Sequence, residues 1–332
     1  MITSGIGSAG SPFDADSYNF PGVPYTEENF NLHFGPDPTC PTSDGEIWDY
    51  NDPVQTRNCM LAGLRDLRQD LIYVRNQIVA YLNKLIDWGV AGFRYGAELG
   101  DVINKKNGQI MAYLSNFGEA WGFTSAVHAV AFLSNHDNQR GHGGGGDRVL
   151  TFWDPKNYKM GYVFMLGWEY GHIRIMSSYY WERDIQPDGP PSDSNGNTNH
   201  VVCFENPGWV CEHRWRQVKN MVKFHNVALG YRVTRWWDNG ANLISWARGT
   251  EDGETVGFIV LNNEDSEEDR SYDTGMPPGT YCDVTKCDSN RPPCVGDGGL
   301  PCPEIVVDDS GWANIVIGAI STTDDPYVVM HV

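Results

Sequence analysis

The spacing of apolar residues divides the chain into three stretches. Residues 1–67 are irregular and rich in Gly, Pro, Asp and Asn, a composition typical of loops. From Asp70 the apolar positions follow a helical spacing, and helices then alternate with short strands. From about Arg235 the apolar period changes to two, which indicates β-strands. We therefore predict boundaries near residues 67 and 234, giving segments 1–67, 68–234 and 235–332.

The middle stretch predicts a parallel α/β arrangement, because helices and strands alternate in it. Only three strands can be counted, whereas a closed (β/α)₈ barrel needs eight. An open sheet of three strands would leave an edge that something must cover. The predicted helices are 70–89, one around Leu99 to Ile103, a further one around Ile110 to Leu114, 155–166 and 212–227, and the predicted strands are 90–94, 127–133 and 173–177.

The last stretch predicts an all-β domain, most simply a Greek-key sandwich. Short runs with alternating apolar residues are separated by turn residues. The predicted strands are 242–246, 256–260, 279–282, 304–307 and 327–330.

Composition narrows the class of protein. The chain has 332 residues and a formal net charge of −19, and an acidic surface repels nucleic-acid phosphates. We expect a neutral partner or a hard cation, no nucleic acid and no membrane, since no apolar run is long enough to span one. Eight cysteines predict disulfides and an oxidising compartment. The first residues lack the apolar core of a signal peptide, so we expect the natural N-terminus to be missing.

One polar cluster stands out at the end of the predicted strand 127–133. Asn135, His136 and Asp137 follow Leu133 after one serine, and a glycine run, Gly143–Gly146, comes soon after. Enzymes with βα units place their chemistry at such strand ends. The alternative is structural: the triplet can form an Asx turn, and the glycines can be a linker.

Several motifs, in order, resemble the animal, chloride-dependent α-amylases. The resemblance covers nearly the whole chain and implies a partial TIM-type barrel, with several strands missing, plus a C-terminal Greek-key domain. The motifs are Ile47 to Asp52, Arg57 to Asp66, Gly89 to Arg94, Tyr95 to Gly100, Asn135 to Asp137, Arg174 to Ser178 and Cys211 to Gln217.

The resemblance also assigns roles to residues of the cleft. It implies that Asp137 stabilises the transition state through the sugar hydroxyls. Tyr50, His136 and His142 match substrate-binding positions. The implied partner is an α-glucan, namely starch, glycogen or maltooligosaccharides, bound by a monomer.

The departure from the family lies beside Arg94. Family members continue from Gly-Phe-Arg, after one more residue, to the nucleophilic Asp, but here Tyr95 and Gly96 follow Arg94. The fifth strand with its acid Glu is absent as well. The chain therefore looks internally deleted and N-terminally truncated. Glu98 and Asp101 are the acids nearest in sequence, and they can replace the missing pair only in a rearranged structure.

Two ion sites are implied by the resemblance. Arg94, Asn135 and Arg174 match the chloride ligands, and guanidinium and amide N–H groups suit an anion; a salt bridge or a capped strand end is the alternative. Arg57, through its carbonyl, and Asp66 match calcium ligands. Calcium needs six to eight oxygen ligands, so this site is incomplete, and Asp66 can also be a simple turn carboxylate.

The resemblance implies the disulfides Cys40–Cys59 and Cys203–Cys211, with Cys282–Cys294 as a third. Cys287 and Cys302 then remain to pair with each other, although four cysteines allow three connectivities. By family the protein is expected to be secreted.

The sequence supports three hypotheses on function. The first is an α-amylase, a retaining glycoside hydrolase of internal α-1,4 bonds, impaired because its nucleophile and acid are absent. The second is a non-catalytic amylase-like chain that binds carbohydrate or a partner protein. The third is an incomplete gene model with a seam at Arg94–Tyr95.

Overall fold

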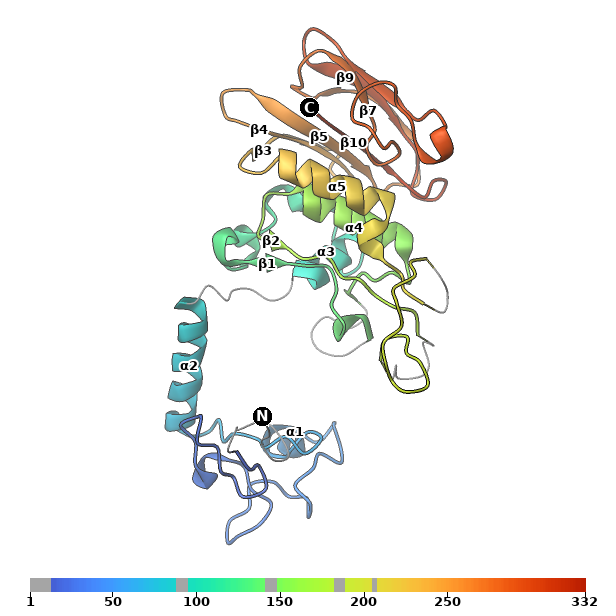
Figure 1. Cartoon of the computed structure of the whole chain (residues 1–332). Coiled ribbons are helices and arrows are strands. Elements are labelled where there is room, and N and C mark those ends of the chain that lie inside the picture. The colour runs from blue at the N-terminus through green and yellow to red at the C-terminus, as the bar shows by residue number, and fades with distance from the viewer. Residues whose placement is uncertain (1–12, 88–94, 141–147, 182–188, 205–207) are drawn as a thin grey trace. The chain divides into compact units, whose positions relative to one another are not determined.

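A computed structural model describes residues 13–87, 95–140, 148–181, 189–204 and 208–332 (Figure 1). The chain divides into two compact units, Met1–Val90 and Ala91–Val332. The predicted strand 90–94, Arg94, His142 and the run Gly143–Gly146 lie outside the described residues. Among those described, no helix has both the length and the apolar character needed to cross a membrane.

The first unit is mostly loops around a small aromatic core. Tyr18, Phe20 and Phe30 pack with Leu67 and Val74, and a disulfide joins Cys40 to Cys59. Its helices are η1 (Glu27–Asn29), α1 (Pro53–Asn58) and α2 (Ile72–Asp87). The predicted helix 70–89 is therefore confirmed within the described residues, and the irregular character of the preceding segment is confirmed too.

The second unit begins with an α/β part dominated by helices. Helix α4 is almost wholly buried, and its first turn is stabilised by Asp154, whose side chain accepts a hydrogen bond from the Asn157 amide (3.4 Å). The strands β1 and β2 are parallel but only two residues long. The elements are α3 (Tyr95–Ile103), η2 (Met111–Asn116), η3 (Glu119–Trp121), η4 (Ala126–His128), β1 (Val130–Ala131), η5 (Asn138–Arg140), α4 (Pro155–Gly167), β2 (His172–Ile173), η7 (Glu212–Arg214) and α5 (Arg216–Val227).

Both predicted strands of this part are wrong in extent. Val127 is 70% exposed and lies in η4 rather than in a strand. The last bond to β1 comes from the Arg174 amide, which donates to Ala131 O (2.8 Å). Further along, the backbone pairs with the segment 208–212: Tyr180 N donates to Gly208 O and Val210 N to Ser178 O. The predicted strand 173–177 therefore shares only Ile173 with β2.

Two predicted helices also differ in form. The helix expected around Ile110 is a 3₁₀-helix, η2. The predicted helix 212–227 is interrupted at Trp215, whose ψ of 137° is extended backbone, so η7 and α5 are separate. The predicted helices at 155–166 and around Leu99 to Ile103 are confirmed as α4 and α3.

The C-terminal domain is a sandwich of two four-stranded antiparallel sheets, with orders β10-β5-β4-β3 and β6-β9-β8-β7. All five predicted strands are present, and β3, β6 and β9 are additional. The strands are β3 (Arg232–Asp238), β4 (Leu243–Gly249), β5 (Thr255–Asn262), β6 (Glu268–Asp273), β7 (Gly279–Cys282), β8 (Glu304–Val307), β9 (Trp312–Ile317) and β10 (Tyr327–His331), with a 3₁₀ turn η8 (Asp297–Gly299).

The first of these sheets is buried on both faces. One face packs on the second sheet, for example through Phe258 and Val260. The other face packs on α4 and α5 through Trp246 and Ile259, and Figure 1 shows these two helices side by side against the sheet. Strands β4, β5 and β10 are consequently buried along their whole length, whereas β8 and β9 alternate between buried and exposed.

Four disulfides close the described loops. Besides Cys40–Cys59, the structure contains Cys203–Cys211, Cys282–Cys294 and Cys287–Cys302. Cys282, Cys287 and Cys294 have sulfur atoms close enough to hold a metal, but each is already bonded to another sulfur. The cysteines therefore staple the β-domain and are not metal ligands.

Candidate functional site

The polar loop after β1 is a tight, internally bonded turn. Asn135 Oδ1 accepts from the amides of Asp137 (3.0 Å) and Asn138 (2.9 Å), and Asn138 Oδ1 accepts from the Asn135 amide (2.7 Å). Such side-chain-to-backbone bonds replace the missing strand ladder at a turn. The Asx turn foreseen as a structural alternative is thus present, and it fixes the backbone that carries His136 and Asp137.

His136 and Asp137 point into solvent from this turn. Their side chains are 72% and 60% exposed, and His136 Nε2 lies 3.4 Å from Asp137 Oδ1. The Asp137 carboxylate therefore remains available to hydroxyl groups of a ligand. An exposed carboxylate with one histidine beside it can bind a sugar, but two-carboxyl hydrolysis needs more than this pair provides.

A buried row of hydroxyl groups lies beneath the turn. Ser134 Oγ and Tyr158 Oη are 2.6 Å apart, Tyr158 and Tyr162 hydroxyls are 3.0 Å apart, and Tyr162 accepts from the Met176 amide (3.3 Å). Burial raises the pKa of both tyrosines, so both stay neutral. The row ties the end of β1 to helix α4 and to the segment after β2.

A second buried network, at Gln139, holds the other end of the turn. Ser178 donates its amide to Glu212 Oε2 (2.7 Å), and its hydroxyl contacts both Glu212 Oε1 and Gln139 Oε1 (2.9 Å). One hydroxyl proton cannot serve two acceptors. Burial raises the pKa of the fully buried Glu212, and a protonated Glu212 resolves the conflict by donating to Ser178 Oγ.

This arrangement predicts a pH-dependent stability. A raised folded-state pKa stabilises the fold fully below the ordinary glutamate pKa, and the contribution is lost as pH rises through the folded value. Glu212→Gln keeps a donor for Ser178 Oγ at every pH. We compare the urea midpoint of Glu212→Gln with that of the native chain at each pH. We expect the difference, variant minus native, to be larger at pH 8 than at pH 5.

Tryptophan fluorescence at both pH values measures this difference. Glu267→Gln serves as the control, because Glu267 is exposed. Equal pH dependence of the native chain and Glu212→Gln would show that Glu212 is charged at both values.

The chloride residues predicted from the resemblance are only partly described. Asn135 follows β1 and Arg174 follows β2, and the parallel pairing of Ala131 with Ile173 brings these strand ends together. Arg174 is exposed, with one guanidinium N–H donating to Ile173 O (3.3 Å). The third predicted ligand, Arg94, lies outside the described residues, so the chloride site stays a prediction.

The predicted calcium residues and Tyr50 lie in the first unit. Asp66 is buried, accepts from Asn31 Nδ2 (2.8 Å) and has a pKa raised by burial, whereas Arg57 is exposed on α1. One carboxylate and one carbonyl fall well short of the oxygen ligands that calcium requires. These residues alone do not fit a calcium ion, and no step proposed below uses one. Tyr50 is 66% exposed, with its ring free to stack on a ligand.

The two acids considered as replacements are engaged elsewhere. Asp101 Oδ2 accepts from Arg148 Nε (2.8 Å), and Glu98 lies 3.5 Å from the same guanidinium. Both belong to helix α3, and Arg148 ties them to the chain leading into α4. This ion-paired role argues against a catalytic role beside Asp137.

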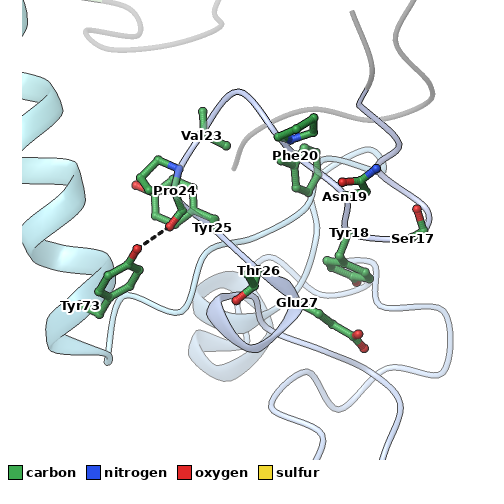
Figure 2. A pocket seen from close by; sticks show the side chains of 11 residues that line it. Ser17, Tyr18, Asn19, Phe20, Val23, Pro24, Tyr25, Thr26, Glu27 and Tyr73 are labelled. Carbon is green, nitrogen blue, oxygen red and sulfur yellow. Dashed lines mark hydrogen bonds between the residues drawn. The ribbon is translucent and has the colours of Figure 1, made fainter.

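The first unit also contains a hollow of about 580 Å³ that sequence reasoning missed (Figure 2). Tyr18, Phe20, Tyr25 and Tyr73 line it, and the Tyr73 hydroxyl donates to Pro24 O (2.7 Å). The close spacing of aromatic and proline residues between 18 and 25 is the signal that was available. The buried networks at Tyr158 and Glu212 left no such local signal, because their members are far apart in sequence.

Comparisons with known proteins agree on one family. The C-terminal all-β domain of α-amylases matches residues 236–331. The chain is 39% identical to an α-amylase of Oryzias latipes, with 98% of this chain and 74% of that protein covered. It is 38% identical to the pancreatic α-amylase of Struthio camelus, with 100% and 79% covered.

A solved structure agrees over the same range. The crystal structure of an α-amylase I variant from Eisenia fetida, in complex with maltohexaose, superposes with a TM-score of 0.73 at 40% identity and covers 100% of this chain and 78% of its own. The alignment with the Oryzias latipes protein runs over 399 positions, although this chain has 332 residues, so some aligned positions have no counterpart here. The predicted fold, a partial barrel with an all-β C-terminal domain, is confirmed, and the chain belongs to the animal-type α-amylases.

Proposed function

We propose that this chain binds α-glucans at the turn formed by Asn135, His136 and Asp137 and does not hydrolyse them. The observation that carries this proposal is that Tyr95 and Gly96, the two residues after Arg94, lie in helix α3 and are not acids. In the family resemblance this is where the strand should continue to the nucleophilic Asp. Neither Tyr95 nor Gly96 can supply that nucleophile.

The chemistry follows from the carboxyl groups. Retaining hydrolysis needs a nucleophile and an acid held about 5–5.5 Å apart, and positioning errors of about 1 Å are already costly. Asp137 corresponds to a third carboxylate that only holds the sugar. Its exposed oxygens accept hydrogen bonds from sugar hydroxyls, and His136 beside it supplies a further polar contact. Binding is retained while bond cleavage is lost.

The relatives support the class of ligand and the compartment. They are α-amylases, and one solved relative holds maltohexaose. Four disulfides and the pancreatic relative support an extracellular protein. Chloride at Asn135 and Arg174 remains part of the proposal as a structural anion, with no catalytic acid for it to tune.

A reducing-sugar assay on amylose and maltoheptaose tests the absence of hydrolysis, and calorimetry with the same maltoheptaose tests binding. We expect no release of reducing sugar above the buffer control. We expect a measurable heat of binding at millimolar maltoheptaose. Asp137→Asn should weaken binding at the turn about tenfold, the effect of losing a hydrogen bond to a charged group. Asp252→Asn, an exposed acid in the β4–β5 turn, is the control. Measurable turnover would refute the proposal, and so would unchanged affinity of Asp137→Asn.

The seam at Arg94–Tyr95 favours one other possibility, an incomplete gene model. Sequencing of transcripts across these two codons decides it. Reads that contain an inserted block with an Asp and a Glu would restore the hydrolase function in full. Reads that join the two codons directly support the binding function.

A further inference from the structure

A second hollow lies at the open edge of the β-domain. Strand β3 ends one sheet and strand β6 ends the other, and a hollow of about 270 Å³ is lined by residues of both strands together with residues of β4 and β9. Edge strands carry unpaired backbone N–H and C=O groups. This edge therefore offers polar backbone groups as well as side chains to a ligand.

Aromatic rings form the apolar walls of this hollow. Trp237 of β3 meets Tyr272 of β6 edge to face, with ring centroids 5.6 Å apart. Trp312 of β9 also lines it and is 45% exposed. Apolar and aromatic walls with a few polar groups are typical of small-molecule sites.

The charged groups of the hollow are paired and leave it nearly neutral. Arg235 is bonded to Asp273. Arg270 is bonded to Glu268 (2.8 Å) and lies over the Trp237 ring at 4.5 Å. Because each guanidinium already has its carboxylate, the hollow does not favour a free anion or cation. Paired charges still donate to and accept from neutral hydroxyl groups.

One buried hydroxyl among the lining residues lacks a partner. Tyr272 is 3% exposed, and its hydroxyl has no hydrogen bond in the part of the chain that the structure describes. Leaving such a group unpaired costs about 1–3 kcal/mol. A ligand hydroxyl that reaches it would recover this energy.

A β-bulge shapes the β3 side of the hollow. The pairing of β3 with β4 shifts between Thr234 and Trp237, and Arg235 has a left-handed φ of 52°. Bulges bend a strand and redirect its side chains. Here the bulge accompanies the pairing of Arg235 with Asp273 across the two sheet edges.

We propose that this edge of the β-domain binds one pyranose ring of an α-glucan, at a site separate from the Asn135–Asp137 turn. The ring's C–H face packs on Trp237 and Trp312, and its hydroxyls bond to Tyr272 and to the Arg235–Asp273 pair. The choice of glucan rests on the proposed function. The hollow, its neutrality and its unpaired hydroxyl do not depend on it.

Hydrogen–deuterium exchange of the full chain with maltotriose tests the site, because it reads each region separately. We expect slower exchange at 232–238 and 268–273, in addition to 134–140. Trp312→Ala should raise the maltotriose concentration needed to protect β3 and β6 from exchange about two- to tenfold, which is the range for loss of an aromatic contact. Val316→Ala, an exposed residue of the same strand β9, should leave it unchanged.

Tyr272→Phe separates a binding role from a structural one. It removes only an unpaired hydroxyl, so the midpoint of urea unfolding should not fall. If the Tyr272 hydroxyl bonds to the sugar, the variant needs several-fold more maltotriose to reach the same protection from exchange at 268–273. Unchanged protection in both Trp312→Ala and Tyr272→Phe would overturn the proposal.

The two proposals fail in different ways. Protection at 134–140 without protection at β3 and β6 overturns the second site and leaves the first. Protection at β3 and β6 without protection at 134–140, and with no effect of Asp137→Asn, supports the second site and overturns the first. No protection in either region overturns both.

Discussion

Replacing Arg248 by Met is expected to lower the free energy of unfolding of the second unit by roughly 3–5 kcal/mol. Arg248 of β4 is 3% exposed. Its guanidinium donates to Gly167 O (3.0 Å), Ala228 O (3.1 Å) and Tyr231 O. Gly167 is the last residue of α4 and Ala228 is the C-cap of α5. One cation therefore satisfies carbonyls at the ends of both helices, where their dipoles are negative.

Arg248 keeps its positive charge although it is buried. Burial lowers its pKa to about 10, so it remains protonated at neutral pH. Methionine fills similar volume but removes one charged donor from each of the three carbonyls, although Gly167 O keeps Trp246 Nε1 (3.1 Å) and Ala228 O keeps the Tyr231 amide (3.1 Å). Urea unfolding followed by fluorescence measures the loss.

Two further variants make this test decisive. Arg232→Met removes an exposed arginine of β3 whose contact to Glu251 is a surface pair, and it should change stability by less than about 1 kcal/mol. Arg248→Lys keeps the positive charge but not the several N–H donors of the guanidinium group. Its loss of stability should lie between those of Arg232→Met and Arg248→Met. A stability of Arg248→Met equal to that of Arg232→Met would contradict the account.

Replacing Gly96 by Ala is expected to cost about 1–3 kcal/mol and to weaken glucan binding at the Asn135–Asp137 turn. A Cβ on Gly96 would lie 2.1 Å from Leu133 O and 3.0 Å from Phe132 O. Both are backbone atoms at the end of β1, so no side chain can move aside. Helix α3 or the strand end must shift, and the turn that follows Leu133 shifts with it.

The measurement combines stability with local exchange. Gly96→Ala should lower the urea midpoint and raise the maltotriose concentration needed to protect 134–140. Gly22→Ala is the control, because a Cβ there has nothing within 4 Å. A variant with native stability and native protection at 134–140 would show that the packing of α3 against β1 is looser than described.

Local patterns sufficed for the long helices and for most of the sandwich. The helical spacing of Leu71, Val74 and Ile78 correctly predicts α2, and the predicted helix from Pro155 begins where α4 begins. Strands β3, β6 and β9 were missed, and for β3 and β6 the reason is their polar composition. Their charged and polar residues, such as Arg232, Glu268 and Asp269, hide the period of two.

The α/β part was less predictable for a different reason. An apolar run such as 127–133 indicates a strand wherever a neighbouring strand pairs with it. Here β1 pairs with β2 over two residues only, since the chain beyond Arg174 bonds instead to the segment 208–212. The extent of a strand is set by its partner, which the run itself does not specify.

The sequence by itself determined the family, the all-β C-terminal domain and the turn-forming triplet Asn135, His136 and Asp137, because each depends on neighbouring residues or on ordered motifs. Only the tertiary structure decided that Arg248 joins β4 to the ends of α4 and α5, that Glu212 is buried against Ser178, and that β3 and β6 enclose a hollow. The partners of these groups lie far away along the chain; Arg248 and Gly167, for example, are 81 positions apart. Burial and hydrogen bonding across such separations arise only when the layers pack together.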